Sequence, residues 1–231
     1  MKSNLKTVLL LMIFFSFGLL AGPAAAASSI TSGQGSLAKL VAQLPQAPLD
    51  AVETADLIHM IEEEKVARDV YSTLFEEWGH WIFDHIALSE QQHVDAVTAL
   101  LERYDIPLPV SMALPGVYDS VEMQELYAAL VEQGRVSLID ALYVGATIED
   151  MDILDLRECI ELTDNPDIET VYENLMRGSR NHLRSFVDQL TLYDIVYTAQ
   201  YLTQEEVDAI VASEHETGLI TTPGNNGQGN N

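Results

Sequence analysis

Four long segments of the chain repeat apolar residues at intervals of three and four, and each repeat is interrupted near its middle by an acidic residue or a histidine. This spacing is typical of a helix that buries one face. Carboxylates are almost never fully buried unless they are paired or bind a metal. The pattern therefore predicts a helical core with charged side chains inside it. The interrupting residues are Glu64, Glu90, His93, Glu149, Asp152 and His182.

The ends of these segments are marked by capping residues, prolines and glycines. No alternating strand pattern persists beyond a few residues, which indicates an all-α protein. Asp50 is a plausible N-cap with Glu53 three residues further on, and Gly79 ends the same helix. We expect four long helices, over residues 50–78, 82–104, 136–162 and 167–193.

The lengths of the connections predict how the helices are arranged. The first and second helices are joined tightly, as are the third and fourth, so each pair should form an antiparallel hairpin. The connection between the hairpins includes a short helix over residues 121–133 and is long enough to return along the bundle. Two hairpins with one long crossover form the ferritin-like variant of the four-helix bundle. A short C-terminal helix should begin at Thr203, where Glu206 completes a capping box.

The two ends of the chain are expected to lie outside the bundle. Lys2 and Lys6 precede an apolar run over residues 8–20 and small residues up to Ala27, as in a cleavable secretory signal. A membrane anchor is the alternative, but the run is short for a full span. We expect an exported protein, periplasmic or extracellular, with no stable membrane insertion after cleavage. The predicted parts are a signal peptide (1–27), a flexible lead-in (28–49), the bundle domain (50–215) and a disordered Gly/Asn-rich tail (216–231).

The charge of the chain restricts its partners. It has 11 Lys and Arg against 36 Asp and Glu, a net charge of −25. This balance argues against nucleic acid and anionic membranes, which attract positive charge, and favours cations. Cys159 is the only cysteine, so there is no intrachain disulfide and no thiolate metal cluster. A metal ion would need oxygen and nitrogen ligands.

The polar positions of the four helices should meet in one layer, because antiparallel helices of similar length align their midpoints. Glu90 and His93 are three residues apart and thus neighbours on one helical face, where both can contact one ion. Each position also has a simpler interpretation. Glu64 can pair with Arg68, and a lone core histidine such as His93 or His182 is more often hydrogen-bonded than metal-bound.

Other charged residues are assigned to less specific roles. Glu62 and Glu63 leave the apolar face of the first helix and are expected to be solvated or to form local pairs. His59 and Asp155 also lie off the apolar faces, where surface roles are expected. Tyr71 lies on the apolar face of the first helix; a redox role near a metal is one interpretation, but an aromatic residue at helical spacing is usually a core residue.

Three strings of the chain resemble the DUF2202 family, which is grouped with the ferritin-like, rubrerythrin-related proteins. They are EEEKVARDVY at residues 62–71, GATIEDMDI at residues 145–153 and GSRNHL at residues 178–183. The resemblance covers about residues 50–195 and implies a ferritin-like fold. It brings no firmly assigned activity.

The broader di-iron pattern of that class assigns a role to each candidate. Ser179 departs from it, because it stands where the second Glu-x-x-His motif would supply its Glu. Asp152, three residues after Glu149, is the candidate to replace the lost carboxylate. The resemblance implies Glu64 and Glu149 as the carboxylates of the first and third helices, Glu90 with His93 as the Glu-x-x-His motif, and His182 as the histidine of the fourth helix.

Two functional hypotheses follow. The first is an exported ferritin-like protein that holds one or two Fe or Mn ions, with oxidoreductase activity on O₂ or a peroxide; zinc is also compatible with these ligands. The second is a non-catalytic, acidic helical protein that sequesters metal or interacts with a partner in the cell envelope. The sequence identifies no catalytic residue and leaves open whether the protein is a homo-oligomer.

Overall fold

The structure of the chain is a computed structural model that describes residues 36–223. This part of the chain is all-helical, as predicted, with no strand. The predicted signal peptide (1–27) and the end of the predicted tail (224–231) lie outside the described residues. The elements are α1 (Ser36–Val41), α2 (Ala51–Trp78), α3 (Trp81–Arg103), the 3-10 helix η1 (Val110–Ala113), α4 (Val121–Gly134), α5 (Leu138–Leu162), α6 (Pro166–Thr191) and α7 (Gln204–Ala212).

The helix ends follow from local capping, and the predicted bounds agree with the observed ones to within two residues. Asp50 and Glu53 form the predicted capping box at the start of α2. Thr203 and Glu206 form the second one at the start of α7. Gly79 ends α2 with a φ of 61°, a left-handed conformation that glycine adopts without steric cost.

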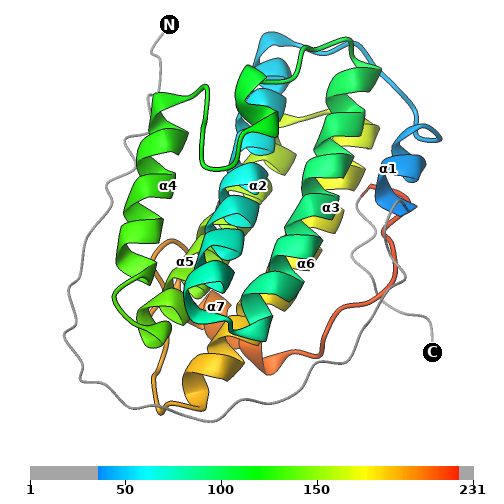
Figure 1. Cartoon of the computed structure of the whole chain (residues 1–231). Helices are drawn as coiled ribbons and strands as arrows, with labels where there is room; N and C mark the ends of the chain where they lie inside the picture. The colour runs from blue at the N-terminus through cyan, green and yellow to red at the C-terminus, as the bar shows by residue number, and fades with distance from the viewer. Residues whose placement is uncertain (1–35, 224–231) are drawn as a thin grey trace, which may run out of the picture.

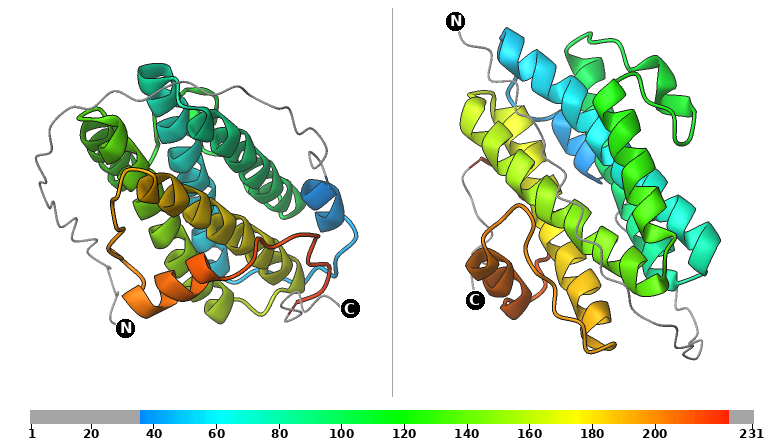
Figure 2. Two further views of the ribbon diagram at one scale, coloured as in Figure 1. Left: turned by 90° about the horizontal axis from the view of Figure 1, so that it is seen from below. Right: turned by 90° about the vertical axis from the view of Figure 1, so that its left-hand side faces the viewer.

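The four long helices form two hairpins, one in front of the other in Figure 1. Helix α2 packs mainly against α3, and α5 against α6. The connection from α3 to α5 contains η1 and α4, and α4 packs on the outside against α2 and α5. Figure 2 shows α4 lying alongside the bundle. The predicted arrangement of two hairpins with a long crossover is therefore present.

The apolar core is divided into two clusters. On α2, Ile61 belongs to one cluster and Val70 to the other, with the buried Glu64 between them. On α3 and α6, charged or polar residues likewise separate the two clusters, and on α5 the buried Glu149 and Asp152 lie between Ile148 and Ile153. A polar layer near the middle of the bundle is thus enclosed by apolar packing on both sides.

The crossover is held to α2 by a lysine that is fully buried. Lys65 Nζ donates to Asp69 Oδ2 at 2.6 Å and to the carbonyl oxygens of Leu114 and Val117 at 3.0 and 3.1 Å. The same ammonium group lies 4.0 Å from the centre of the Tyr118 ring. These contacts compensate for the burial of the charge and fix the path of the crossover.

Parts of the two segments that were expected to be flexible or disordered pack against the bundle. Residues 36–41 form α1, and Val41 is buried. Near the other end, Glu216 pairs with Arg184. The Asn174 side chain donates a hydrogen bond to the carbonyl oxygen of Ile220 and accepts one from the Ile220 N–H group. The ordered domain therefore extends beyond the predicted bounds of 50–215.

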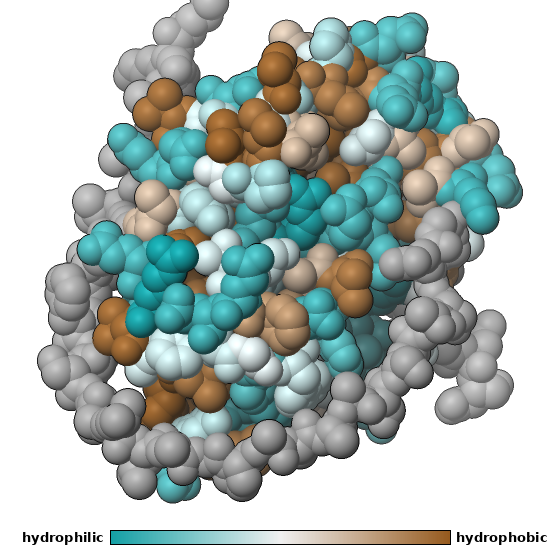
Figure 3. Space-filling view, viewed as in Figure 1, coloured by the Kyte–Doolittle hydropathy of each residue, from teal (hydrophilic) through white to brown (hydrophobic). Residues whose placement is uncertain are grey.

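The surface mixes polar and apolar residues. In Figure 3, apolar side chains gather in the upper part of the view, where Figure 1 shows the crossover. Exposed apolar residues of this segment include Val110, Leu114, Val117 and Val121. Among the helices of residues 36–223, none combines the length and the apolar character needed to span a membrane.

Replacing Lys65 by Met should lower the free energy of unfolding by about 3 kcal/mol, because Asp69 would lose a partner inside the protein. Urea denaturation followed by circular dichroism measures this effect. Lys39→Met is the matched control, since Lys39 is exposed on α1 and its replacement should change stability by at most about 0.5 kcal/mol. Equal unfolding midpoints for the two variants would show that Lys65 does not hold the crossover.

Candidate metal centre

All six residues predicted from the sequence lie in the polar layer between the apolar clusters, and none is more than 8% exposed. They come from all four long helices of the bundle. Five of them form two overlapping groups in which the potential ligand atoms lie within 4.8 Å of one another. Glu90 belongs to both groups. The first group is Glu64, Glu90 and His93, and the second is Glu90, Glu149 and His182.

The two oxygens of Glu90 face different histidines. His93 Nδ1 lies 2.8 Å from Glu90 Oε2 and 3.1 Å from Glu64 Oε2. His182 Nδ1 lies 2.7 Å from Glu90 Oε1 and 3.3 Å from Glu149 Oε2. Glu90 therefore stands between two sets of nitrogen and oxygen atoms, which is the position of a bridging carboxylate.

Two of the four distances, Glu64 to His93 at 3.1 Å and Glu149 to His182 at 3.3 Å, match the separation of ligands around one ion, whereas the two Glu90 contacts are shorter. Two ligand atoms at about 2.1 Å from a metal, at angles of about 90–110°, lie about 3.0–3.4 Å apart. Glu90 Oε1 and His182 Nδ1 are both buried and lie close together, but the geometry of this contact is not that of a hydrogen bond. Glu64 Oε1 is likewise buried without a hydrogen bond within residues 36–223. Buried polar atoms without a hydrogen bond are rare in proteins. In this layer, such atoms are placed so that their lone pairs can bind one cation.

The ionisation of the layer is strongly perturbed. Burial disfavours a charge on Glu90, but His93 and His182 on either side hold its pKa far below the usual value. Burial would lower the pKa of His182, yet Glu90 and Glu149 raise it to about 10. For Glu64, burial dominates and raises the pKa to about 8. The carboxylates thus favour positive charge at the histidine nitrogens, and a metal ion bound there would displace their protons.

Two further residues orient the candidate ligands. Ser89 Oγ lies 2.9 Å from His182 Nε2, which leaves Nδ1 of the same ring facing the carboxylates. The hydroxyl of Tyr71 donates to Glu149 Oε1 and also contacts the carbonyl oxygen of Gly145 at 3.3 Å. Hydrogen bonds of this kind fix the orientation of metal ligands. Tyr71, for which the sequence left open a core position or a role near a metal, therefore contacts the site directly.

The His93 ring is packed against a glycine of α6. A Cβ atom added at Gly178 would lie 2.6 Å from His93 Nε2 and 2.8 Å from its Cε1. Real Cβ contacts are not this short, so a larger residue would displace the ring. Gly178 thus leaves the space that His93 needs beside α6.

Asp152 lies in the layer but outside both groups. Its Oδ2 accepts a hydrogen bond from Ser179, while its Oδ1 is buried without a hydrogen bond from residues 36–223. Burial, followed by the neighbouring carboxylates of Glu64, Glu63 and Glu149, raises its pKa well above the usual value. The expectation that Asp152 replaces the carboxylate missing at Ser179 stays a prediction.

The surroundings of α2 differ from two sequence expectations. Arg68 does not pair with Glu64; its guanidinium donates to Asp69 and Gln91. Glu62 and Glu63 are buried rather than solvated: Glu62 accepts the backbone N–H groups of Asp119 and Ser120, while Glu63 forms a local pair with His59, the second of the two expected outcomes.

A third group of potential ligands was missed by the sequence analysis. It consists of His59, Glu63 and Asp155. The i,i+4 spacing of His59 and Glu63 was the available signal in the sequence.

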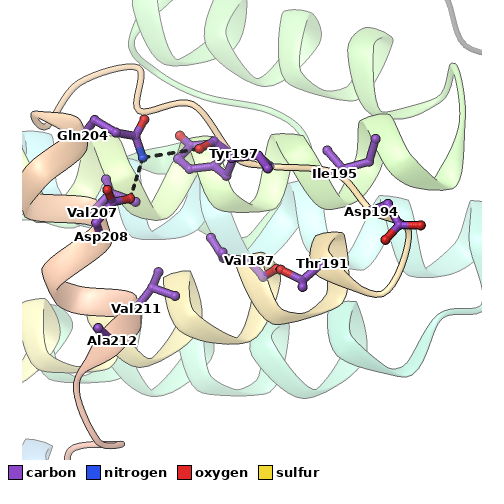
Figure 4. A pocket seen from close by; sticks show the side chains of 11 residues that line it. Val187, Thr191, Asp194, Ile195, Tyr197, Gln204, Val207, Asp208, Val211 and Ala212 are labelled. Carbon is purple, nitrogen blue, oxygen red and sulfur yellow. Dashed lines mark hydrogen bonds between the residues drawn. The ribbon is translucent and has the colours of Figure 1, made fainter.

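A surface pocket of about 450 Å³ lies elsewhere, between the end of α6 and α7. Figure 4 shows Val187, Val207 and Val211 on its apolar side, and Gln204 bonded to Asp208 and to the backbone of Tyr197. None of the candidate ligands lines this pocket.

Comparison with known proteins identifies the family. The family model described as "Uncharacterized protein domain (DUF2202)" matches residues 53–214. The chain belongs to the DUF2202 family. Uncharacterized protein MJ0754 of Methanocaldococcus jannaschii is 52% identical over 179 residues, which cover 78% of this chain and 97% of that protein.

A solved structure supports the fold of this DUF2202 chain. The crystal structure of hypothetical protein MJ0754 from Methanococcus jannaschii matches with a TM-score of 0.73 and 54% identity. The match covers 75% of this chain and 99% of the other. The resemblance to the DUF2202 family is therefore confirmed, and neither relative's description names a function.

Replacing Gly178 by Ala should weaken metal binding about 10–100-fold, the usual effect of disturbing residues that support metal ligands. Isothermal titration with Mn²⁺ would measure the affinity. Gly134→Ala is the matched control, because its Cβ would lie 2.6 Å from Leu74 Cδ2, in the apolar core. The control should keep the affinity of the unmodified protein. The same affinity in both variants would contradict a ligand role for His93.

Proposed function

We propose that this DUF2202 protein binds two transition-metal ions inside its helical bundle. The observation that carries the proposal is the pair of buried groups that share Glu90, each with two carboxylates and one imidazole. Glu64 and His93 would hold one ion, and Glu149 and His182 the other. Glu90 would bridge them.

The chemistry of the ligands favours Fe or Mn. Carboxylate and imidazole groups suit these metals, and zinc is compatible with them as well. A centre of this kind inside two hairpins joined by a long crossover is the arrangement of ferritin-like proteins, to which we assign this fold.

The environment of the centre supports oxidoreductase chemistry. A pair of reduced Fe or Mn ions supplies electrons for the reduction of O₂ or a peroxide. The residues of this chain bind and orient the ions, while the apolar clusters on both sides keep bulk water out. Tyr71 holds Glu149 in place and keeps its own proton, because burial and then the nearby carboxylates raise its pKa well above the usual value.

One observation favours the second candidate function, sequestration of metal without catalysis. Ser179 stands where a second bridging Glu would be expected, and its hydroxyl donates to Asp152. The two groups then share only one carboxylate, Glu90. A centre with fewer bridging oxygens is less suited to hold both ions through a two-electron reaction, and storage requires no such reaction.

The metal content of the purified protein tests the proposal. Elemental analysis should find about two Fe or Mn ions per chain in the unmodified protein. Glu90→Gln should lose at least one of them, because an amide carries no charge to offset two cations, while helicity should be retained. Glu102→Gln removes an exposed carboxylate from the same helix and should keep both ions. Unmodified protein without transition metal under replete conditions would contradict the proposal.

We also propose that residues 1–27 direct export of the protein and are then removed. The support is the short apolar run followed by small residues that end at Ala27. N-terminal sequencing of the protein from outside the cytoplasm should find a chain that begins at Ala27 or Ser28. Recovery of intact Met1 in the membrane fraction would show that this segment is an anchor.

A further inference from the structure

The group formed by His59 and Glu63 of α2 and Asp155 of α5 differs from the other two in its location. The His59 side chain is 44% exposed, whereas the Glu63 side chain is 4% exposed. The potential ligand atoms of the three residues lie within 4.8 Å of one another. The group therefore reaches from the surface into the protein.

Glu63 is a buried carboxylate that needs positive charge close to it. Both of its oxygens are buried, and neither accepts a hydrogen bond from residues 36–223. Its ion-pair partner is His59, whose Nε2 lies 3.4 Å from Glu63 Oε2. A buried carboxylate without hydrogen bonds is costly unless positive charge is close to it. Two carboxylates and one imidazole suit a divalent transition-metal ion at this position.

The residues of the outer group adjoin residues of the buried layer in the sequence of both helices. Glu63 precedes Glu64 in α2, and Asp155 lies three residues after Asp152 on neighbouring positions of α5. Asp152 Oδ1 and Glu64 Oε1 are both buried and accept no hydrogen bond from the described residues. Buried carboxylate oxygens without a hydrogen bond, on Glu63, Glu64 and Asp152, thus lie on neighbouring parts of α2 and α5.

We propose that His59, Glu63 and Asp155 form a third cation site, at which a divalent metal ion binds before it passes along Asp152 and Glu64 to the centre. The negative charge of the chain attracts cations to its surface, and the exposed imidazole of His59 provides the first ligand. The third site stands on its own geometry, while its role in supply rests on the proposed function.

Titration with Mn²⁺ tests the third site, since binding removes the electron paramagnetic resonance signal of the hydrated ion. The full chain should bind three Mn²⁺ ions, and the double variant His59→Ala, Asp155→Asn should bind two. The double variant Asp84→Asn, His85→Ala is the matched control, because it makes the same changes at exposed positions of α3. The control should bind three ions. Equal stoichiometry in the two double variants would overturn the third site.

The supply role and the proposed function are tested separately. Uptake of the two tightly held ions should be about tenfold slower in the His59 and Asp155 double variant than in the control, since an attracting site is lost. Equal uptake rates would overturn the supply role. In a Glu90→Gln background, the His59 and Asp155 changes should still remove one ion per chain. This difference measures the third site even if the buried centre binds no metal.

Discussion

The position of Glu90 between two histidines is the constraint on which the rest of the structure depends. Its two oxygens lie 2.8 Å from His93 Nδ1 and 2.7 Å from His182 Nδ1. Burial of a carboxylate costs several kcal/mol unless opposite charge and good geometry offset it. Both rings must therefore be held in place, and the apolar clusters on the two sides of the layer hold the helices that carry them.

Helix α2 packs against α3, α4 and α5, and the charged residues of its segment 62–71 contact these neighbours. Glu62 accepts backbone N–H groups at the start of α4. Lys65 and Asp69 hold the crossover, and Tyr71 donates to a candidate ligand on α5. Glu64 faces the polar layer. One helix thus joins the crossover to the site, and disturbing the crossover should also affect the candidate ligands.

The sequence predicted the helices and the layer because both depend on local signals. Capping residues such as Asp50 and Thr203 set the helix ends, and midpoints of antiparallel helices align. The burial of Glu63 was not predictable in this way. It depends on the packing of α4 and α5 against α2, and these contacts are remote in sequence. For Asp152, the face of the helix was predicted, but its bond to Ser179 depends on side-chain orientation.

X-ray diffraction from crystals of the metal-loaded protein, recorded on both sides of the Fe or Mn absorption edge, tests the central claim most directly. The account predicts two anomalous peaks in the polar layer, one on each side of Glu90. One should contact Glu64 and His93, and the other Glu149 and His182. A layer without an anomalous peak, in which both rings keep their contacts with the carboxylates, would contradict it.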